Sequence, residues 1–377
     1  MTRPRVARAG ENETRRGSAV VVGASLAGLM TGLALSRVGI GVTVLERATG
    51  FPRTGAAIRL DESRRRRLAQ LGRSIQAVIP SCAPDLVPST WTAVHDALCA
   101  AVAADPHIEV RHDTAVQHVD QDAESAWAVA ADGSTFRGDV VVGADGYRSL
   151  VRRHVAPEKP DATFAGYLIW LGLADEAAIP SPRRWPLDVA FLSSADEYLF
   201  GYPVPGHDGS LLPGSRQLGW AWYDAGRNDL LRETGCVVGS HVHHSLTAAH
   251  IPAATFRALA DEACDRWPAP WRDAILDCIR RRAIVGTPIT EYVPDRLVDR
   301  RLALVGDAAH VPTPMTGMGF GASLDDAEAI AAAIAAGRNG SSVVEALRAY
   351  ERKRLGTVRR MVQSGQEFSR GFASRTA

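Results

Sequence analysis

A glycine-rich turn between two short apolar segments is the feature that most constrains how this chain folds. Ala19 to Val22 is a continuous, valine-rich apolar run, as a buried parallel strand requires. Gly23 to Gly28 then turns the chain, and Leu29 to Val38 carries apolar residues at helical spacing. Val42 to Leu45 is a second apolar run. The pattern predicts a strand, helix and strand unit of about 30 residues.

The turn has the small residues that the pyrophosphate of a dinucleotide needs. Gly23 and Gly28 hold the first and last glycine positions of the nucleotide-binding fingerprint, and Ser25 replaces the middle one. A helix that begins at such a turn offers free N–H groups and a partial positive charge to the phosphates. Glu46 lies 23 residues after Gly23, where an acid accepts both ribose hydroxyls and disfavours a 2′-phosphate. The unit predicts an FAD or NAD site, although the turn alone also fits an α/β protein without a nucleotide.

Composition narrows the classes of function. The chain has 43 basic and 42 acidic side chains, so nothing in its charge favours a nucleic-acid partner. No apolar run approaches the roughly 20 residues that cross a bilayer, which predicts no membrane segment. The cysteines form no CxxC pair, which argues against a flavin disulfide reductase and fits reduced thiols in the cytoplasm. They are Cys82, Cys99, Cys236, Cys264 and Cys278.

The rest of the chain alternates between a nucleotide-binding pattern and a β-rich insertion. Residues 163–223 have the pattern of strands and hold many aromatic side chains, whereas residues 225–285 have a helical pattern. An apolar run at 301–305 predicts another buried strand, and alanine-rich residues 325–336 predict a helix. The predicted division of the chain is a disordered leader at 1–17, a discontinuous nucleotide-binding domain at 18–60, 91–162 and 286–340, a substrate-binding domain at 61–90 and 163–285, and a C-terminal helix at 341–377. The charged pattern of this last segment predicts a helix from Val343 to about Gln363, and the prolines within 80–90 predict a loop.

Two later segments each place an aspartate directly after a predicted buried strand. Asp145 follows the run that ends at Gly143, and Asp307 follows the run that ends at Val305. A carboxylate at either place can accept hydrogen bonds from ribityl hydroxyls or backbone amides. Residues 317–321 precede the next predicted helix, so their N–H groups can face an anion. Reduced flavin is such an anion, because its negative charge gathers at N1 and O2.

Together these three segments resemble the motifs of the class A (single-component) flavoprotein monooxygenases, the family of para-hydroxybenzoate hydroxylase. The chain resembles most the branch of the dihydroxypyridine and urate hydroxylases, over residues 18–350. The resemblance implies an α/β fold with a glutathione-reductase-type (Rossmann-like) FAD-binding domain and an inserted β-rich substrate domain. It implies that NADH or NADPH reduces the FAD, and that a flavin C4a-hydroperoxide formed with O2 hydroxylates a small planar aromatic or heteroaromatic substrate. A monomer and a homodimer both fit it.

The resemblance also assigns residues to the adenosine half of the FAD. Glu46 would hold the ribose, with Arg47 beside the adenine and the backbone of Val116 against it. The residues that would line the pyrophosphate are Gly23, Ser25, Leu26, Ala27 and Gly28.

The flavin half and the substrate receive the remaining assignments. Asp145 would support the FAD site and the nicotinamide cofactor, and Gly306 with Asp307 would hold the ribityl chain. The loop against the isoalloxazine would consist of Pro314, Gly317, Met318, Gly319 and Phe320. The expected substrate contacts are Trp170, Tyr202, Trp220, Trp222 and Pro312.

Three positions depart from the pattern of the family. Asp96 stands where the helix of residues 92–103 commonly offers the FAD an arginine, and Leu171 stands where the related branch often has arginine. Residues 317–321 read Gly-Met-Gly-Phe-Gly instead of the usual Gly-Gln-Gly-Ala-Asn. Two alternatives therefore stay open: the same fold performing epoxidation or Baeyer–Villiger oxidation, and a flavin-binding accessory protein without oxygenase turnover.

Flavin-driven chemistry requires neither a nucleophile nor a metal. His310 is the candidate base for deprotonating a substrate, and the alternative is that it packs or hydrogen-bonds behind the flavin loop. His241, His243 and His244 lack the ligand spacing of a metal site, so we predict a surface turn there and no metal. The arginine run Arg64 to Arg67 either attracts the phosphates of the nicotinamide cofactor or forms a solvated helix face.

Overall fold

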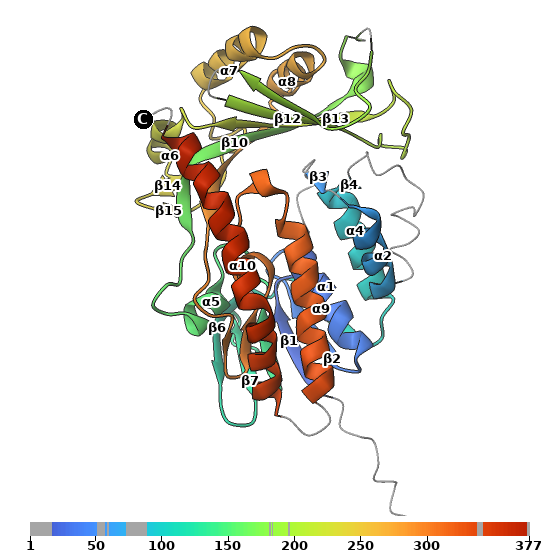
Figure 1. Ribbon diagram of the computed structural model, residues 1–377, viewed down its shortest axis with the longest axis vertical. Helices are drawn as coiled ribbons and strands as arrows, with labels where there is room; N and C mark the ends of the chain where they lie inside the picture. The colour runs from blue at the N-terminus through green and yellow to red at the C-terminus, as the bar shows by residue number, and fades with distance from the viewer. Residues whose placement is uncertain are drawn as a thin grey trace, which may run out of the picture.

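The computed structural model describes residues 17–50, 57–58, 60–72, 89–180, 182, 184–194, 197–337 and 342–374. Figure 1 shows a lower body of helices around a parallel sheet, and above it an antiparallel sheet backed by two helices. This arrangement confirms the predicted α/β class with a β-rich second domain. Within the described ranges, no helix combines the length and the apolar character needed to cross a membrane.

The lower sheet has six strands, and the first of them lies at its centre. Its strands in spatial order are β17 (Val298–Asp299), β18 (Leu302–Leu304), β9 (Val140–Gly143), β1 (Ser18–Val22), β2 (Gly41–Leu45) and β5 (Ile108–Arg111). Every pair from β18 to β5 is parallel, and only β17 runs antiparallel at the edge. The parallel strands therefore end at one edge of the sheet, and the three predicted motifs that follow β1, β9 and β18 meet there.

Helices cover one face of this sheet, and a small second sheet covers the other. Helix α1 (Leu26–Arg37) is buried at ten of its twelve residues, because it lies between the sheet, α4 (Trp91–Ala103) and α9 (Gly319–Gly337). A helix that is packed on nearly every side needs the continuous apolar composition seen in the sequence. The other face is covered by a small antiparallel sheet of β6 (Val116–Gln121), β7 (Ala126–Ala130) and β8 (Thr135–Gly138), with α5 (Leu150–Val155) beside it.

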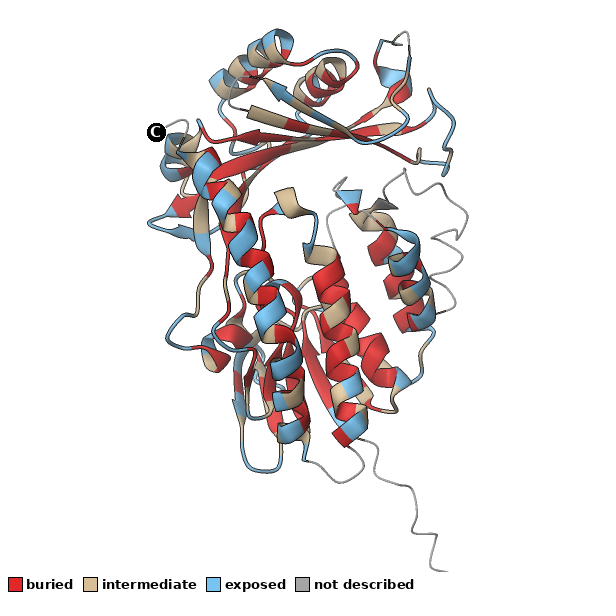
Figure 2. Cartoon of the chain, viewed as in Figure 1, coloured by how far each residue is buried: buried red, intermediate tan, exposed pale blue. Residues whose placement is uncertain are grey.

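The upper sheet is antiparallel throughout and is also covered on both faces. Its strands in order are β11 (Ala190–Ser194), β12 (Glu197–Val204), β13 (Gln217–Asp224), β10 (Thr163–Asp175) and β16 (Ile284–Glu291). Helices α7 (Ala253–Arg266) and α8 (Trp271–Arg280) lie on its upper side, away from the lower body (Figure 1). In Figure 2 the strands at the centre of this sheet are largely buried. A sheet that is buried on both faces loses the plain alternation of apolar and polar residues.

Helix α10 (Val343–Ala373) connects the two bodies. It begins with a capping box between Ser342 and Glu345, packs along α9, and reaches the upper sheet (Figure 1). The sequence predicted its end near residue 363, but the helix continues for another ten residues. It continues because its buried face does, with Gly365, Ser369 and Phe372 spaced three or four residues apart.

Two predicted domain boundaries need correction. Helix α2 (Glu62–Leu71) was assigned to the substrate domain, yet Leu68 and Leu71 are buried in the core around α1. Strand β16 belongs to the upper sheet, so the nucleotide-binding domain resumes after residue 291 instead of at 286. Residues 1–16 of the predicted leader at 1–17, and residues 80–88 of the predicted loop at 80–90, lie outside the described residues. The remaining short elements are β3 (Ala57–Ile58), β4 (Ser89–Thr90), α6 (Asn228–Glu233), β14 (Val237–Val238), β15 (His241–Val242), η1 (Glu176–Ala178), η2 (Gly306–Ala308) and η3 (Pro314–Thr316).

Candidate cofactor and substrate site

The glycine-rich turn has a geometry that only glycine permits at two positions. Gly23 has φ +103°, and a Cβ placed on it would lie 2.5 Å from the carbonyl oxygen of Ala144. A Cβ on Gly28 would lie 1.9 Å from the carbonyl oxygen of Gly23. Ser25 caps α1 without a side-chain hydrogen bond to the helix, and Leu26 is buried, so its backbone alone can meet a ligand. The turn therefore presents backbone N–H groups and a serine hydroxyl, which suits a pyrophosphate.

Glu46 braces this turn from the end of β2. Its Oε2 accepts a hydrogen bond from the Ala24 N–H at 2.8 Å, and its Oε1 accepts one from the Ala48 N–H at 2.9 Å. Each carboxylate oxygen keeps a lone pair for a ribose hydroxyl. The Thr114 N–H donates to the Glu46 carbonyl at 2.8 Å, which brings the strand that begins at Val116 alongside. Arg47 is exposed beyond them.

Helix α4 presents His95, not Asp96, to the glycine-rich turn. The Nε2 of His95 lies 3.1 Å from the carbonyl oxygen of Ala24, and its ring stacks on Trp91 with centroids 4.6 Å apart. His95 is buried, whereas Asp96 is exposed. The expectation that Asp96 replaces an FAD-contacting arginine stays a prediction, and the structure adds His95 as the residue of α4 that meets the turn.

Asp145 and the turn around Asp307 are joined through Arg152. The carboxylate of Asp145 accepts hydrogen bonds from the N–H groups of Leu150 and Val151, at 2.7 and 3.2 Å, and so anchors the start of α5. Arg152, on that helix, is fully buried and donates to the carbonyl oxygens of Asp307 and Ala308, at 3.2 and 3.1 Å. Asp145 thus holds the start of α5 in place, and Arg152 on that helix fixes the backbone of the turn around Asp307.

The Asp307 carboxylate is the acidic group best placed to meet a cofactor. Its side chain is exposed to solvent, yet the surrounding protein removes enough water to raise its pKa, an effect opposed by His310 and Arg152. Both observations hold for a carboxylate that lines an open cleft. Among the described residues it has no hydrogen-bond partner. Gly306, with φ +58°, brings this turn against the glycine-rich turn, since a Cβ there would lie 2.6 Å from the Cβ of Ala27.

His310 lies behind the flavin loop and is closed off from solvent. Its Nε2 lies 2.7 Å from Oδ2 of Asp326, which also accepts from the Gly306 N–H at 3.0 Å. The Oδ1 of Asp326 accepts from the Nε of Arg354 at 2.7 Å. Burial acts to raise the pKa of Asp326, but His310 and Arg354 together lower it. The proposal of His310 as a base for the substrate is therefore wrong, and the alternative of a hydrogen bond behind the loop holds.

The expected flavin loop leads directly into a helix. Residues 314–316 form η3, Gly317 adopts φ +61°, and α9 begins at Gly319 instead of near residue 325. The first N–H groups of α9 have no partner within the helix and can face an anion. Pro312 lies beside this start, 3.7 Å from where a Cβ on Gly319 would be. Phe320 packs against the core, and Met318 is exposed.

A hydrogen bond connects the flavin loop to the upper sheet. The hydroxyl of Tyr167, on β10, lies 2.6 Å from the hydroxyl oxygen of Thr313. Burial raises the pKa of Tyr167 to about 12, so the phenol stays protonated at neutral pH. The sequence did not predict this contact, because neither Tyr167 nor Thr313 belongs to a recognisable motif.

The three tryptophans expected at the substrate lie on the wrong side of the sheet. Trp170, Trp220 and Trp222 are buried among residues of α7 and α8, and the Nε1 of Trp170 donates to Asp224 at 2.9 Å. Side chains alternate along a strand, so their neighbours Leu171, Ala221 and Tyr223 lie on the face toward the lower body. That face is where a ring beside the flavin loop would meet the sheet.

Tyr202, also expected at the substrate, lies on this lower face. It is paired with Gly219, and a Cβ on Gly219 would lie 2.1 Å from the Tyr202 ring. Burial raises the pKa of its phenol, opposed by a hydrogen bond from the backbone of Ala57.

The histidine-rich segment lies at the surface. His241, His243 and His244 are exposed at and after the β14–β15 hairpin, as predicted for a surface turn. No group of three or more potential ligand side chains that could hold a metal occurs in the described part of the chain.

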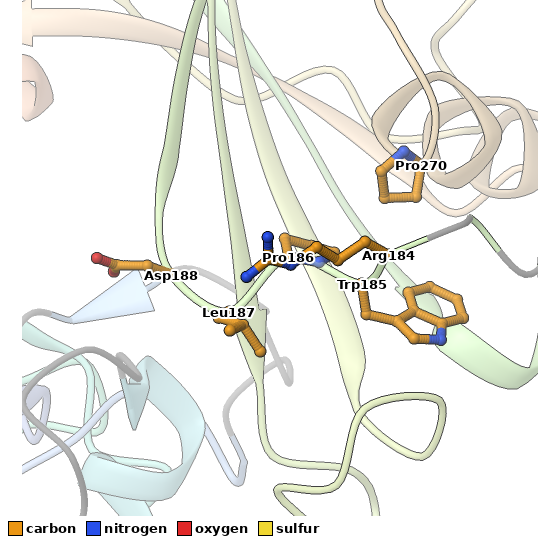
Figure 3. Close-up of a pocket in the computed structure, with 6 residues that line it drawn as sticks. All are labelled: Arg184, Trp185, Pro186, Leu187, Asp188 and Pro270. Atoms are coloured by element: carbon orange, nitrogen blue, oxygen red, sulfur yellow. The ribbon is translucent and has the colours of Figure 1, made fainter.

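A depression in the upper domain is separate from these motifs. It has a volume of about 310 Å³ and is lined by residues 184–188 and Pro270. Figure 3 shows Asp188 and Trp185 pointing to opposite sides, so its side chains do not converge on a ligand. None of the residues assigned to a cofactor lines it.

Comparison with known proteins agrees with this geometry. A protein family described as FAD binding domain matches residues 16–78, 80–198 and 263–365, and a second one, FAD binding domain-like, matches residues 164–278. The chain is 26% identical to 2,6-dihydroxypyridine 3-monooxygenase of Paenarthrobacter nicotinovorans, over 82% of this chain and 81% of that protein. It is also 26% identical to FAD-dependent urate hydroxylase of Klebsiella pneumoniae, over 91% and 87% of the two chains.

Solved structures share the fold. The structure of 2,6-dihydroxypyridine-3-hydroxylase from Arthrobacter nicotinovorans matches with a TM-score of 0.74 and 19% identity, over 96% of this chain and 94% of the other. A Klebsiella pneumoniae protein solved with FAD and uric acid matches with a TM-score of 0.69 and 20% identity, over 95% and 89%.

Proposed function

This chain belongs to the FAD binding domain family and is an FAD-dependent monooxygenase, and from that premise we propose that it hydroxylates a small aromatic or heteroaromatic ring with O2 and NADH or NADPH. The observation that carries the proposal is the meeting of three segments at one edge of the lower sheet. The glycine-rich turn, the Asp307 turn and the start of α9 are far apart in sequence, and the contact of Gly306 with Ala27 brings the first two together.

The residues at this edge fit an FAD. We propose that the turn from Gly23 to Gly28 holds its pyrophosphate, Glu46 its adenosine ribose, and Asp307 its ribityl chain. Bound FAD supplies the redox chemistry, by accepting electrons from a nicotinamide and activating O2. The residues of the protein bind and orient the cofactor and the substrate, and they exclude water from the site.

The start of α9 is proposed to stabilise the negative charge of the reduced cofactor. Its free N–H groups carry partial positive charge, and they are fixed in position before any reaction occurs. The carboxylate of Asp326 holds the Gly306 N–H from behind, while Tyr167 holds Thr313 from above. Both contacts keep the loop from moving when the charge develops.

The lower face of the upper sheet is proposed to cover the ring of the substrate. Leu171 lies on that face, where the related branch often has arginine, and Tyr223 lies beside it. An apolar side chain at that place favours a ring without a carboxylate. We therefore expect hydroxypyridines and neutral phenols to be better substrates than benzoates.

Substrate-stimulated turnover tests the proposed reaction. The FAD-loaded protein is mixed with NADH or NADPH, isotopically labelled O2 and a panel of hydroxypyridines, phenols and benzoates. We expect at least one ring to accelerate nicotinamide oxidation and to gain one labelled oxygen atom. Nicotinamide oxidation that no ring accelerates would instead favour a flavin-binding protein without oxygenase turnover, and a lactone or epoxide product would favour the other chemistries of this fold.

A further inference from the structure

A second cavity lies beside the flavin loop. It has a volume of about 440 Å³ and is formed by α2, the start of α9 and α10. In Figure 1, α10 and α9 run side by side, and α2 lies on the opposite side of α9 from α10. Four arginines line the cavity, and we call it the arginine pocket: Arg64, Arg67, Arg354 and Arg360. The loop residues Met318 and Gly321 complete the wall toward the flavin site.

Two of the four arginines are held by carboxylates of α9. Arg67 pairs with Asp325 at 2.5 Å and with Glu328 at 2.8 Å, and Arg354 pairs with Asp326 at 2.7 Å. Neighbouring Glu328 is the largest cause of a raised pKa at Arg67. These pairs fix the shape of the pocket, and their three carboxylates fully offset the two guanidinium groups.

The other two arginines differ from them. The guanidinium of Arg64 pairs with Asp61 at 3.4 Å and lies against the loop, since a Cβ on Gly321 would be 2.8 Å from it. Arg360 is exposed, and among the described residues no carboxylate lies within ion-pair distance of it. Arg360 is therefore the pocket arginine whose own charge no described carboxylate compensates, and it lines the same cavity as Met318 and Gly321 at the start of α9.

We propose that the arginine pocket binds a phosphate group of the nicotinamide dinucleotide that reduces the flavin. The inference rests on the proposed function, because it requires that the nicotinamide reach the flavin loop. Guanidinium groups bind phosphate oxygens through paired N–H donors, and the pocket brings such groups together from two helices, α2 and α10. Its volume suits the charged part of the ligand and not a whole dinucleotide.

Equilibrium binding to the FAD-loaded protein tests the pocket. Calorimetry at constant low ionic strength gives the Kd of NADP⁺, NAD⁺ and inorganic phosphate for the unaltered protein, Arg360→Ala and Arg64→Ala. Arg352→Ala is the matched control. Arg352 is exposed on α10, the helix of Arg360, and lies outside the pocket, so its substitution removes the same charge without changing the pocket. We expect the Kd of at least one dinucleotide to rise about tenfold in Arg360→Ala and to change less than about twofold in the control.

The ligands distinguish the two phosphate sources. Weakening of NADP⁺ alone assigns the 2′-phosphate to the pocket, and equal weakening of NADP⁺ and NAD⁺ assigns the pyrophosphate. Competition by inorganic phosphate that disappears in Arg360→Ala supports either assignment. Affinities for both dinucleotides that match the control in Arg360→Ala and Arg64→Ala would overturn the proposal.

Anaerobic bleaching separates this failure from failure of the proposed function. If NADH or NADPH bleaches the flavin equally well in all variants, the pocket proposal is wrong, but the proposal that a nicotinamide is the electron donor holds. If dithionite bleaches the flavin but neither nucleotide binds the protein or bleaches it, both the pocket proposal and the proposed use of a nicotinamide are wrong.

Discussion

The lower body and the upper domain both bury charged groups, but they use them for different purposes. In the lower body, Asp326 joins His310, Arg354 and the Gly306 N–H, so one carboxylate holds two helices and a turn of the cofactor site. In the upper domain, Glu176 accepts from Arg216 at 2.7 Å and holds loop residues well away from the flavin loop. The comparison teaches that burial of an ion pair does not by itself mark a functional site; what the pair holds in place does.

The largest effect should come from breaking these two buried pairs. Asp326→Asn and Glu176→Gln each leave a buried cation without its carboxylate, and each should lower the free energy of unfolding by about 3–5 kcal/mol. Only Asp326→Asn should also lower the affinity for FAD, because only Asp326 holds the Gly306 turn. Urea denaturation and FAD titration measure the two quantities. Equal loss of FAD affinity in both variants would remove the distinction between the two regions.

A smaller effect is expected from the tryptophan that the sequence placed at the substrate. Trp170→Phe removes a buried hydrogen bond to Asp224 and should cost about 1–3 kcal/mol of stability. The KM for a ring substrate should stay unchanged, since Trp170 faces α7 and α8. Tyr223→Phe, on the opposite face, is the comparison and should alter KM more than stability. A large KM change in Trp170→Phe would place the substrate on the helix-covered side.

The contrast between His95 and Asp96 should be visible in cofactor affinity. His95→Ala removes the hydrogen bond to the Ala24 carbonyl in the glycine-rich turn, and the loss of one such bond should raise the Kd of FAD about tenfold. Asp96→Ala should change it less than about twofold. Fluorescence quenching during FAD titration measures both. The reverse order would restore Asp96 as the residue that faces the cofactor.

The smallest effect concerns pH. Burial raises the pKa of Asp224, opposed by Arg227 and by the Trp170 hydrogen bond. A carboxyl group whose pKa is raised by folding contributes stability below its unfolded pKa of about 3.9, and this contribution is lost as the pH rises through the folded value. Asp224→Asn should therefore gain stability relative to the unaltered protein as the pH rises from about 4 to 7. Urea midpoints at several pH values measure this difference, and a constant difference would contradict it.

The cofactor side of the molecule could be predicted from sequence because its signals are local. A valine-rich run followed by glycines, and an aspartate after each later apolar run, indicate strand ends, and parallel strand ends meet at one edge. His95 was also within reach of the sequence: Val94, Leu98 and Ala101 define the buried face of α4, and residue 95 lies on it. The start of α9 was missed because its glycines read as loop, although a helix can begin with them.

The substrate side could not be predicted in the same way. Trp170 and Leu171 are neighbours on a strand covered on both faces, and no local pattern states which face meets the cofactor. Arg152, Asp326 and Tyr167 act through partners that are distant in sequence, so their roles depend on the fold itself. The arginine run was predicted to be either a solvated helix face or an attractor of phosphates. Arg66 is exposed but Arg65 is buried, and the cavity is what supports the second interpretation for Arg64.

The central claim is that the strand edge of the lower body holds an FAD that a nicotinamide can reduce. The most direct measurement is the visible spectrum of the purified protein after incubation with FAD and desalting, followed by anaerobic addition of NADH or NADPH. The account predicts flavin absorbance that survives desalting and is bleached by at least one nucleotide, faster when a hydroxypyridine or phenol is present. A folded protein that stays colourless after FAD incubation would contradict the account.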